Sequence, residues 1–104
     1  MAWQVGSDGL IPTTGSATIS KVLTGTASLN FDLTALTVQD LTITVTGAAD
    51  GDCVILGVPN GGITTRVQYT AWVSAPDTVT VRAGTIAIGE NPGSVTFRAT
   101  VIKF

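Results

Sequence analysis

The sequence predicts an all-β protein, a single antiparallel β-sandwich or small barrel of about seven or eight short strands. Threonine and other β-branched residues, which favour strands, are abundant, and only 12% of the 104 residues are charged. Short runs alternate apolar and polar residues, as half-buried strands do. Clusters of Gly, Pro, Asn and Asp separate these runs, and no window has helical periodicity.

Residues 1–15 are expected to form an extended N-terminal arm, followed by a β-sandwich domain over residues 16–104. Glycines and a proline interrupt any periodic pattern in the arm. The arm nevertheless carries apolar side chains that a disordered tail would lack: Trp3, Val5, Leu10 and Ile11. We expect these four residues to form an interface by docking on another surface. The alternative is that the arm pairs with its own sandwich as an edge strand.

Alternation places the strands of the first half of the domain. Residues 17–22 give a weak signal, residues 29–33 a good one and residues 41–45 the clearest one. Residues 53–56 are continuously apolar, which predicts a central strand covered on both faces. Cys53, the single cysteine, begins this run and is expected to be a small buried hydrophobe rather than a reactive thiol.

The second half predicts a hairpin and a final strand. Residues 67–74 and 78–82 alternate on either side of a turn at residues 75–77, where Pro76 suits the second position. Residues 84–94 contain three glycines and a proline, so a loop with at most a short strand is expected there. Alternation returns over residues 95–102.

Little in the sequence indicates catalysis. The chain has no histidine, which removes the usual general base and most zinc sites. Most of the acidic residues stand beside turn formers, where Asp bonds to its own backbone. Asp50-Gly51-Asp52 permits a calcium interpretation but lacks the further spaced acids of a calcium loop, so a turn is favoured. We expect a protein that is not an enzyme and uses no cofactor or metal.

Charge and hydropathy also bear on partners. The net charge is −2, and the five basic residues are scattered, which gives no support for nucleic-acid binding. No apolar stretch approaches the roughly 18 residues of a membrane span, so no membrane partner is expected.

The aromatic residues divide into core and surface candidates. Phe31 and Phe97 alternate with polar neighbours and are expected in the core. Tyr69 and Trp72 have odd spacing and so lie on opposite faces of one strand. If Tyr69 faces the core, Trp72 faces outward as an interface anchor or as a platform for a sugar, although ordinary sheet packing remains open.

A dispersed pattern in the second half is shared with a known class of module. Its elements are Gly51-Asp52-x-Val54, Pro59, Ala71-Trp72-Val73-Ser74-Ala75, Asp77-Thr78-Val79-Thr80-Val81-Arg82, Pro92 and Phe97-Arg98-Ala99-Thr100-Val101-Ile102-Lys103. This pattern resembles the small β-sandwich modules of tailed-phage virions, which occur as capsid decoration (cement) proteins and at the tips of tail or head fibres. The resemblance covers roughly residues 16–104.

The resemblance implies a jelly-roll-like virion structural protein, assembled as a homotrimer or other cluster. Its partners would be copies of itself and the major capsid protein, on the capsid surface of a phage assembled in the cytoplasm of a bacterial host. The chain begins with Met1 and has no fibrous repeat, so we expect a decoration protein. The alternative is a receptor- or carbohydrate-binding tip of a tail fibre. An enzyme such as a carboxylate-based hydrolase would need two acids in one cleft.

Overall fold

A computed structural model describes residues 18–34, 37–64, 66–85 and 90–104. The predicted arm, with Trp3, Val5, Leu10 and Ile11, lies outside the described residues. The described residues contain six strands and one short 3-10 helix: β1 (Lys21–Leu33), β2 (Val38–Thr44), β3 (Cys53–Gly57), η1 (Asn60–Gly62), β4 (Val67–Ala75), β5 (Thr78–Thr85) and β6 (Glu90–Lys103).

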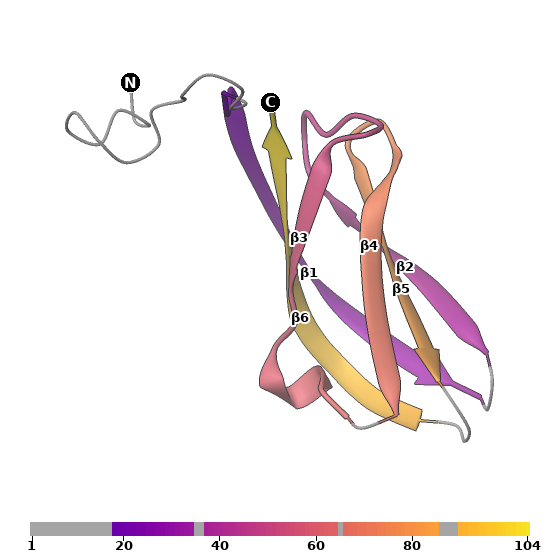
Figure 1. Cartoon of the computed structure of the whole chain (residues 1–104). Coiled ribbons are helices and arrows are strands. Elements are labelled where there is room, and N and C mark those ends of the chain that lie inside the picture. The colour runs from indigo at the N-terminus through magenta and orange to yellow at the C-terminus, as the bar shows by residue number, and fades with distance from the viewer. Residues whose placement is uncertain (1–17, 35–36, 65, 86–89) are drawn as a thin grey trace.

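The strands form two three-stranded antiparallel sheets, with the order β1-β6-β3 in sheet A and β2-β5-β4 in sheet B. The two sheets lie side by side with their inner faces toward each other (Figure 1). The predicted all-β class is therefore confirmed. Six strands are described where seven or eight were predicted, and a jelly-roll topology stays a prediction. Within the described residues, no helix combines the length and the hydropathy of a membrane span.

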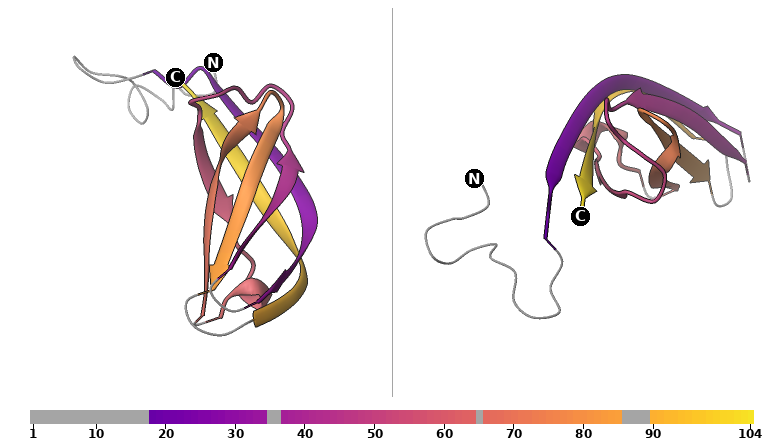
Figure 2. Two further views of the ribbon diagram at one scale, coloured as in Figure 1. Left: turned by 90° about the vertical axis from the view of Figure 1, so that its right-hand side faces the viewer. Right: turned by 90° about the horizontal axis from the view of Figure 1, so that it is seen from above.

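The long strand β1 replaces two predicted segments, 17–22 and 29–33. It pairs with β6 from Lys21 opposite Lys103 to Phe31 opposite Gly93. Viewed from above, it curves around one side of the molecule (Figure 2). The alternation of large apolar residues fails in its middle because Gly25, which faces inward, is too closely packed to carry a side chain. For this reason a continuous strand over residues 21–33 was not predicted.

The expected loop over residues 84–94 is wrong at both ends. Strand β5 continues to Thr85, and β6 begins at Glu90. Pro92 and Gly93 lie within β6, near the point where its register with β1 shifts, and Gly93 has a positive φ of 82°. A proline and a glycine are tolerated in a strand at such an irregularity, which is why their presence misled the prediction.

The predicted hairpin is confirmed as β4 and β5, which pair antiparallel around a turn at Pro76 and Asp77. Asp77 has a positive φ of 61°, a conformation that Asp tolerates better than most residues. Its Oδ1 accepts a hydrogen bond from the Gly47 N–H (2.7 Å), and its backbone bonds with Val45 and Ala48. The hairpin turn is thereby fixed to the loop that follows β2.

One hydrophobic core fills the space between the sheets. Phe31 and Phe97 are almost fully buried, as predicted. With Tyr69 they form a cluster whose ring centroids are 5.2–5.8 Å apart, in the tilted and edge-on arrangements that aromatic pairs prefer. The remaining fully buried large side chains are Ile43, Val45, Val79, Val81 and Val101.

The prediction of a doubly covered central strand at residues 53–56 is wrong. Among the described residues, strand β3 is the edge of sheet A and pairs only with β6. Val54 and Leu56 face the core, whereas Cys53 and Ile55 are exposed. The expected burial of Cys53 is therefore wrong as well. A short run without polar residues does not reveal which of its faces is covered.

Candidate functional site

The candidate functional surfaces are the outer faces of the two sheets, because no pocket is found among the described residues. Each outer face is built by the residues that alternate with the core positions. Both faces carry many threonines, but each also has one distinct feature. Sheet B carries a tryptophan beside an ion pair, and sheet A carries a group of exposed apolar side chains.

Trp72 lies on the outer face of sheet B with 38% of its surface exposed. This orientation was predicted from its spacing to Tyr69, which packs against the core. Trp72 stands opposite Thr80 of β5, and Thr80 is buried and donates a hydrogen bond to Ser74 Oγ (2.6 Å). The Trp72 indole therefore lies on a hydrogen-bonded part of sheet B.

Arg82 lies diagonally across the sheet from Trp72, and its guanidinium carbon is 4.8 Å from the centroid of the indole ring. This is a cation–π contact. Arg82 also forms a bidentate ion pair with Asp40 of β2: Nε donates to Oδ1 (2.8 Å) and Nη2 donates to Oδ2 (3.0 Å). We call Asp40, Trp72 and Arg82 the Trp72 cluster. It spans all three strands of sheet B.

The ion pair holds both of its members in the charged state. The hydrogen bonds from Arg82 lower the pKa of the Asp40 carboxyl below its ordinary value. The same hydrogen bonds raise the pKa of the Arg82 guanidinium. The cluster thus presents an aromatic ring beside a fixed dipole, with no free charge.

The chemistry of this surface suits recognition. Tryptophan and arginine are, with tyrosine, the residues most enriched at the hot spots of protein interfaces. Exposed threonines surround the cluster, and their hydroxyls can donate and accept hydrogen bonds. These flanking residues are Thr42, Thr44 and Thr70. An indole among such groups also has the elements of a sugar-stacking platform.

The outer face of sheet A carries exposed apolar side chains at one end. Val22, Ile102 and Cys53 stand in one cross-strand row, and Ile55 lies in the next row beside Thr100 and Thr24. Phe104, two residues beyond Ile102, ends the chain on the same side by alternation. We call this set the apolar patch: Val22, Cys53, Ile55, Ile102 and Phe104.

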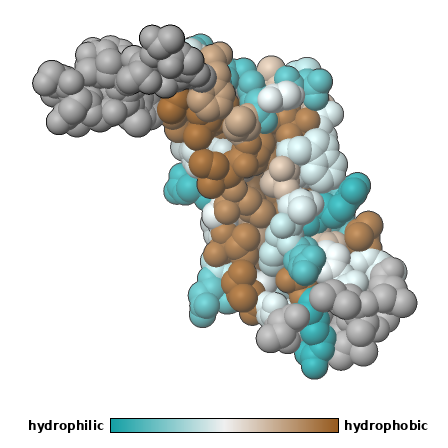
Figure 3. Space-filling view, in the orientation of Figure 1, coloured by the Kyte–Doolittle hydropathy of each residue, from teal (hydrophilic) through white to brown (hydrophobic). Residues whose placement is uncertain are grey.

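Three of the patch residues are large and well exposed, namely Val22 (44%), Ile55 (57%) and Phe104 (64%). In Figure 3, hydrophobic side chains form a band over the region where β3 lies in Figure 1. Toward the other end, sheet A turns polar. There Arg98 Nη1 donates a hydrogen bond to Thr24 Oγ1 (2.9 Å), and Ser28 bonds to Ser94 (2.7 Å).

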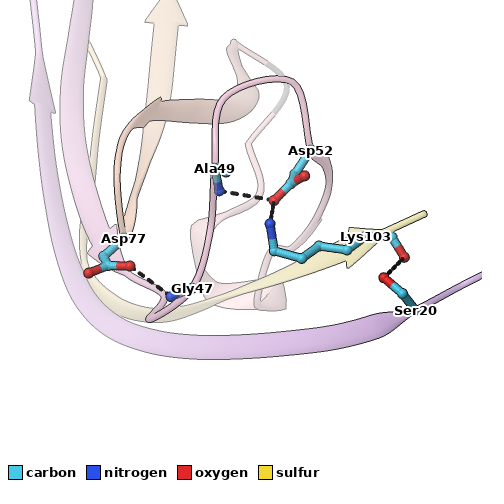
Figure 4. Close-up of polar contacts among 6 residues, drawn as sticks. All are labelled: Ser20, Gly47, Ala49, Asp52, Asp77 and Lys103. Atoms are coloured by element: carbon cyan, nitrogen blue, oxygen red, sulfur yellow. Dashed lines mark hydrogen bonds and ion pairs between the residues drawn. The ribbon is translucent and has the colours of Figure 1, made fainter.

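Beside the patch, a polar contact joins the end of β6 to the loop that precedes β3. Lys103 Nζ lies 2.6 Å from Asp52 Oδ2, which also accepts a hydrogen bond from the Ala49 N–H at 2.9 Å (Figure 4). The Lys103 contact, followed by the Ala49 N–H, lowers the pKa of Asp52. Asp52 thus bonds to its own turn through the Ala49 N–H and to the end of β6 through Lys103. Among the described residues, no three His, Cys, Asp or Glu side chains are grouped to hold a metal ion.

Of the interface residues predicted from sequence, only Trp72 is described, and it stands outward as expected. Trp3, Val5, Leu10 and Ile11 lie outside the described residues, so their docking stays a prediction. The roles of Asp40 and Arg82 were not predicted, because their ion pair depends on the pairing of β2 with β5. The apolar patch was also missed, because its residues come from three strands.

The comparisons with known proteins give no relative: no family model, no curated protein and no solved structure matches the chain.

Proposed function

We propose that this protein is a structural module that works by binding copies of itself and a larger assembly, and not by catalysis. The observation that carries the proposal is the Trp72 cluster. It is an exposed indole on the edge strand β4, in contact with Arg82 of the central strand β5, and Arg82 is itself bonded to Asp40 of β2. A ring that is already fixed loses little conformational entropy when a partner covers it.

The rest of the sheet suits a rigid contact surface. Antiparallel strands with a packed core form a firm layer, and the outward threonines keep that layer polar with few charges. Repetition of one modest contact over many copies then supplies strength without any chemistry. A decoration protein that holds a capsid together against the pressure of the packaged DNA needs this property.

The assembly we propose is a phage head, with the protein as a decoration protein on the capsid surface and a homotrimer as its state. This finer proposal depends on the resemblance of residues 16–104 to virion modules. The major capsid protein is the second partner under this proposal. The low charged share of 12% agrees with a chain that buries part of its surface between subunits.

The test is the mass of the full chain in solution, measured by sedimentation velocity, followed by binding to expanded phage capsids. We expect an oligomer that binds capsids, and we expect Trp72→Ala to weaken association. Gln68→Ala, an exposed polar change on the same face of β4, is the matched control. A strict monomer that ignores capsids would contradict the proposal.

A second candidate is a receptor- or carbohydrate-binding tip, because the same cluster combines an exposed indole with fixed polar groups. Sugar rings stack on exposed indoles. Ion pairs such as Asp40–Arg82 and threonine hydroxyls can form hydrogen bonds with the hydroxyl groups of the sugar. Binding to a glycan array that disappears in Trp72→Ala but persists in Gln68→Ala would favour this candidate over the first.

A further inference from the structure

The apolar patch of sheet A is not used by the proposed function. Its most exposed strand residues are Val22, Cys53 and Ile55. The patch is continuous because Ile102 pairs across the sheet with Val22 on one side and with Cys53 on the other. Exposed large apolar residues scattered singly need no explanation, but a contiguous group does. This group lies at the end of the sheet where β1 begins.

We propose that the occupant of the apolar patch is the N-terminal segment of the same chain, residues 1–17. The first reason is composition. The segment carries Trp3, Val5, Leu10 and Ile11, which would otherwise face water. A single tryptophan brings about 150–250 Å² of surface to bury. Apolar side chains on the segment thus match an apolar group on the sheet.

The second reason is position. Residues 18–20 connect the segment to β1, whose second residue, Val22, is a member of the patch, and the Ser20 N–H bonds to the Lys103 carbonyl (2.7 Å) at the same edge. Residues 12–19 separate Ile11 from Ser20, and an extended stretch of that length reaches up to about 27 Å. Cys53 and Ile55 lie only two strand spacings from β1, about 10 Å away. Pro12 and Gly15 offer places for the chain to reverse.

The third reason is charge. Asp8 is the only charged side chain in residues 1–17 and falls between the two apolar pairs of the segment. The flank of the patch carries Arg98, outward and exposed, and Lys21 at the start of β1. Asp8 would therefore meet basic side chains on this flank, and of the two acids before Cys53, Asp50 and Asp52, the second is already paired with Lys103.

Docking within one chain is favoured over docking between chains. A tethered segment acts at an effective concentration of about millimolar, and it avoids the loss of translational and rotational freedom that association entails. A second copy that covers the patch is the competing occupant. The two cases differ in how protection of the patch depends on protein concentration.

Cys53 provides a direct probe, because it is the only cysteine in the chain and lies in the patch. The measurement is the rate at which the Cys53 thiol of the full-length protein reacts with DTNB. The test variant combines Trp3→Ser, Leu10→Ser and Ile11→Ser. The control combines Gln4→Ser and Thr13→Ser, which change the segment without removing apolar groups. All of these changes lie outside the described strands β1 to β6.

We expect the test variant to react about tenfold faster than the wild type, which corresponds to about 1.4 kcal/mol of docking free energy. The control should react at the wild-type rate. The wild-type rate should not change with protein concentration, as long as that concentration stays far below millimolar. Equal rates in the wild type and the test variant would overturn the inference. Protection that grows with protein concentration would assign the patch to a second copy and also overturn it.

A reciprocal readout uses Trp3 itself. In a Trp72→Phe background, Trp3 is the only tryptophan, because the chain has two. Its emission should shift to longer wavelength when Ile55→Asn is introduced in the patch; an emission already typical of solvent-exposed indole would contradict docking. The inference is independent of the proposed function: an oligomer with an unprotected Cys53 overturns the inference alone, and a monomer with a protected Cys53 counts against assembly alone.

Discussion

Gly25 of β1 lies so close to Thr44 of β2 that a β-carbon on residue 25 would overlap with the carbonyl oxygen of Thr44. The same β-carbon would stand 3.1 Å from Cγ2 of Val45. The two strands belong to different sheets, so this contact is where the edge of sheet A meets the edge of sheet B. The absence of a side chain at residue 25 is what allows the approach.

Gly25→Ala is therefore expected to lower the free energy of unfolding by about 1–3 kcal/mol, the usual cost of overpacking. Urea denaturation followed by circular dichroism measures it. Gly57→Ala in β3 is the matched control, because its β-carbon would meet only Arg98 atoms at an ordinary 3.6 Å. We expect a change of less than about 0.5 kcal/mol there. Equal losses in the two variants would contradict the close approach at Gly25.

The contact between Asp52 and Lys103 predicts an acid-sensitive contribution to stability. The hydrogen bonds from Lys103 and the Ala49 N–H lower the pKa of Asp52 in the folded protein. The unfolded chain therefore binds the proton more readily, and the contribution is present above the unfolded value, about 3.9. It is lost as the pH falls from that value through the lower pKa of the folded state.

Asp52→Asn should remove this part of the pH dependence, so that the mutant loses less stability than the wild type on acidification through that window. Lys103→Met, which removes the first donor but leaves the Ala49 N–H in place, should reduce this pH dependence in part. Urea unfolding at a series of acidic pH values measures both. Wild-type slopes in both variants would show that the contact does not couple to folding.

The inward and outward assignments came correctly from the sequence wherever large residues alternated. Phe31 and Phe97 are in the core, and Tyr69 and Trp72 lie on opposite faces, because a strand has a strict period of two. The prediction failed at residues 53–56, where four apolar residues in a row leave no alternation to interpret. Edge or central position is decided by the other strands, and those are remote in sequence.

The candidate surfaces were the least predictable part. Trp72 was found from its spacing, but its partners Arg82 and Asp40 depend on the register of three strands. The apolar patch is also a product of register, since it joins Val22 to residues about 30 and 80 positions away. Sequence alternation gives the face of each residue but not its cross-strand neighbour.

Tyr69 gives a prediction that a spectrophotometric titration can test directly, because it is the only tyrosine in the chain. Its hydroxyl donates a hydrogen bond to the Gly62 carbonyl (2.6 Å), and burial raises the pKa of the phenol above its ordinary value of 10.0. Phenolate absorbance should therefore appear at higher pH in the folded protein than in urea. The corresponding stability is present below the unfolded pKa and is lost as the pH rises through the folded one.

Tyr69→Phe removes only the hydroxyl and leaves the Gly62 carbonyl without this donor. We expect a loss of about 0.5–1.5 kcal/mol in unfolding free energy at neutral pH, the typical net value of a hydrogen bond. The loss of stability at alkaline pH should also become shallower. A folded protein whose tyrosine titrates at the same pH as the unfolded chain would contradict the burial of this ring.

Phe97 is the residue on which the core depends most directly, because it is fully buried and its ring contacts both Phe31 and Tyr69, at 5.8 and 5.2 Å between centroids. Phe97→Ala should lower the unfolding free energy by about 3–5 kcal/mol, since the cavity cannot fully collapse between two sheets. That is a large share of the roughly 5–15 kcal/mol of a typical domain. Phe97→Leu, with a smaller loss, keeps the effect measurable if the alanine variant unfolds.

Thr96→Ala is the matched control. Thr96 is the exposed neighbour of Phe97 on the other face of β6, and its change to alanine should alter stability by less than about 0.5 kcal/mol. Comparable losses at residues 96 and 97 in urea denaturation would mean that the two faces of β6 are not divided between core and solvent.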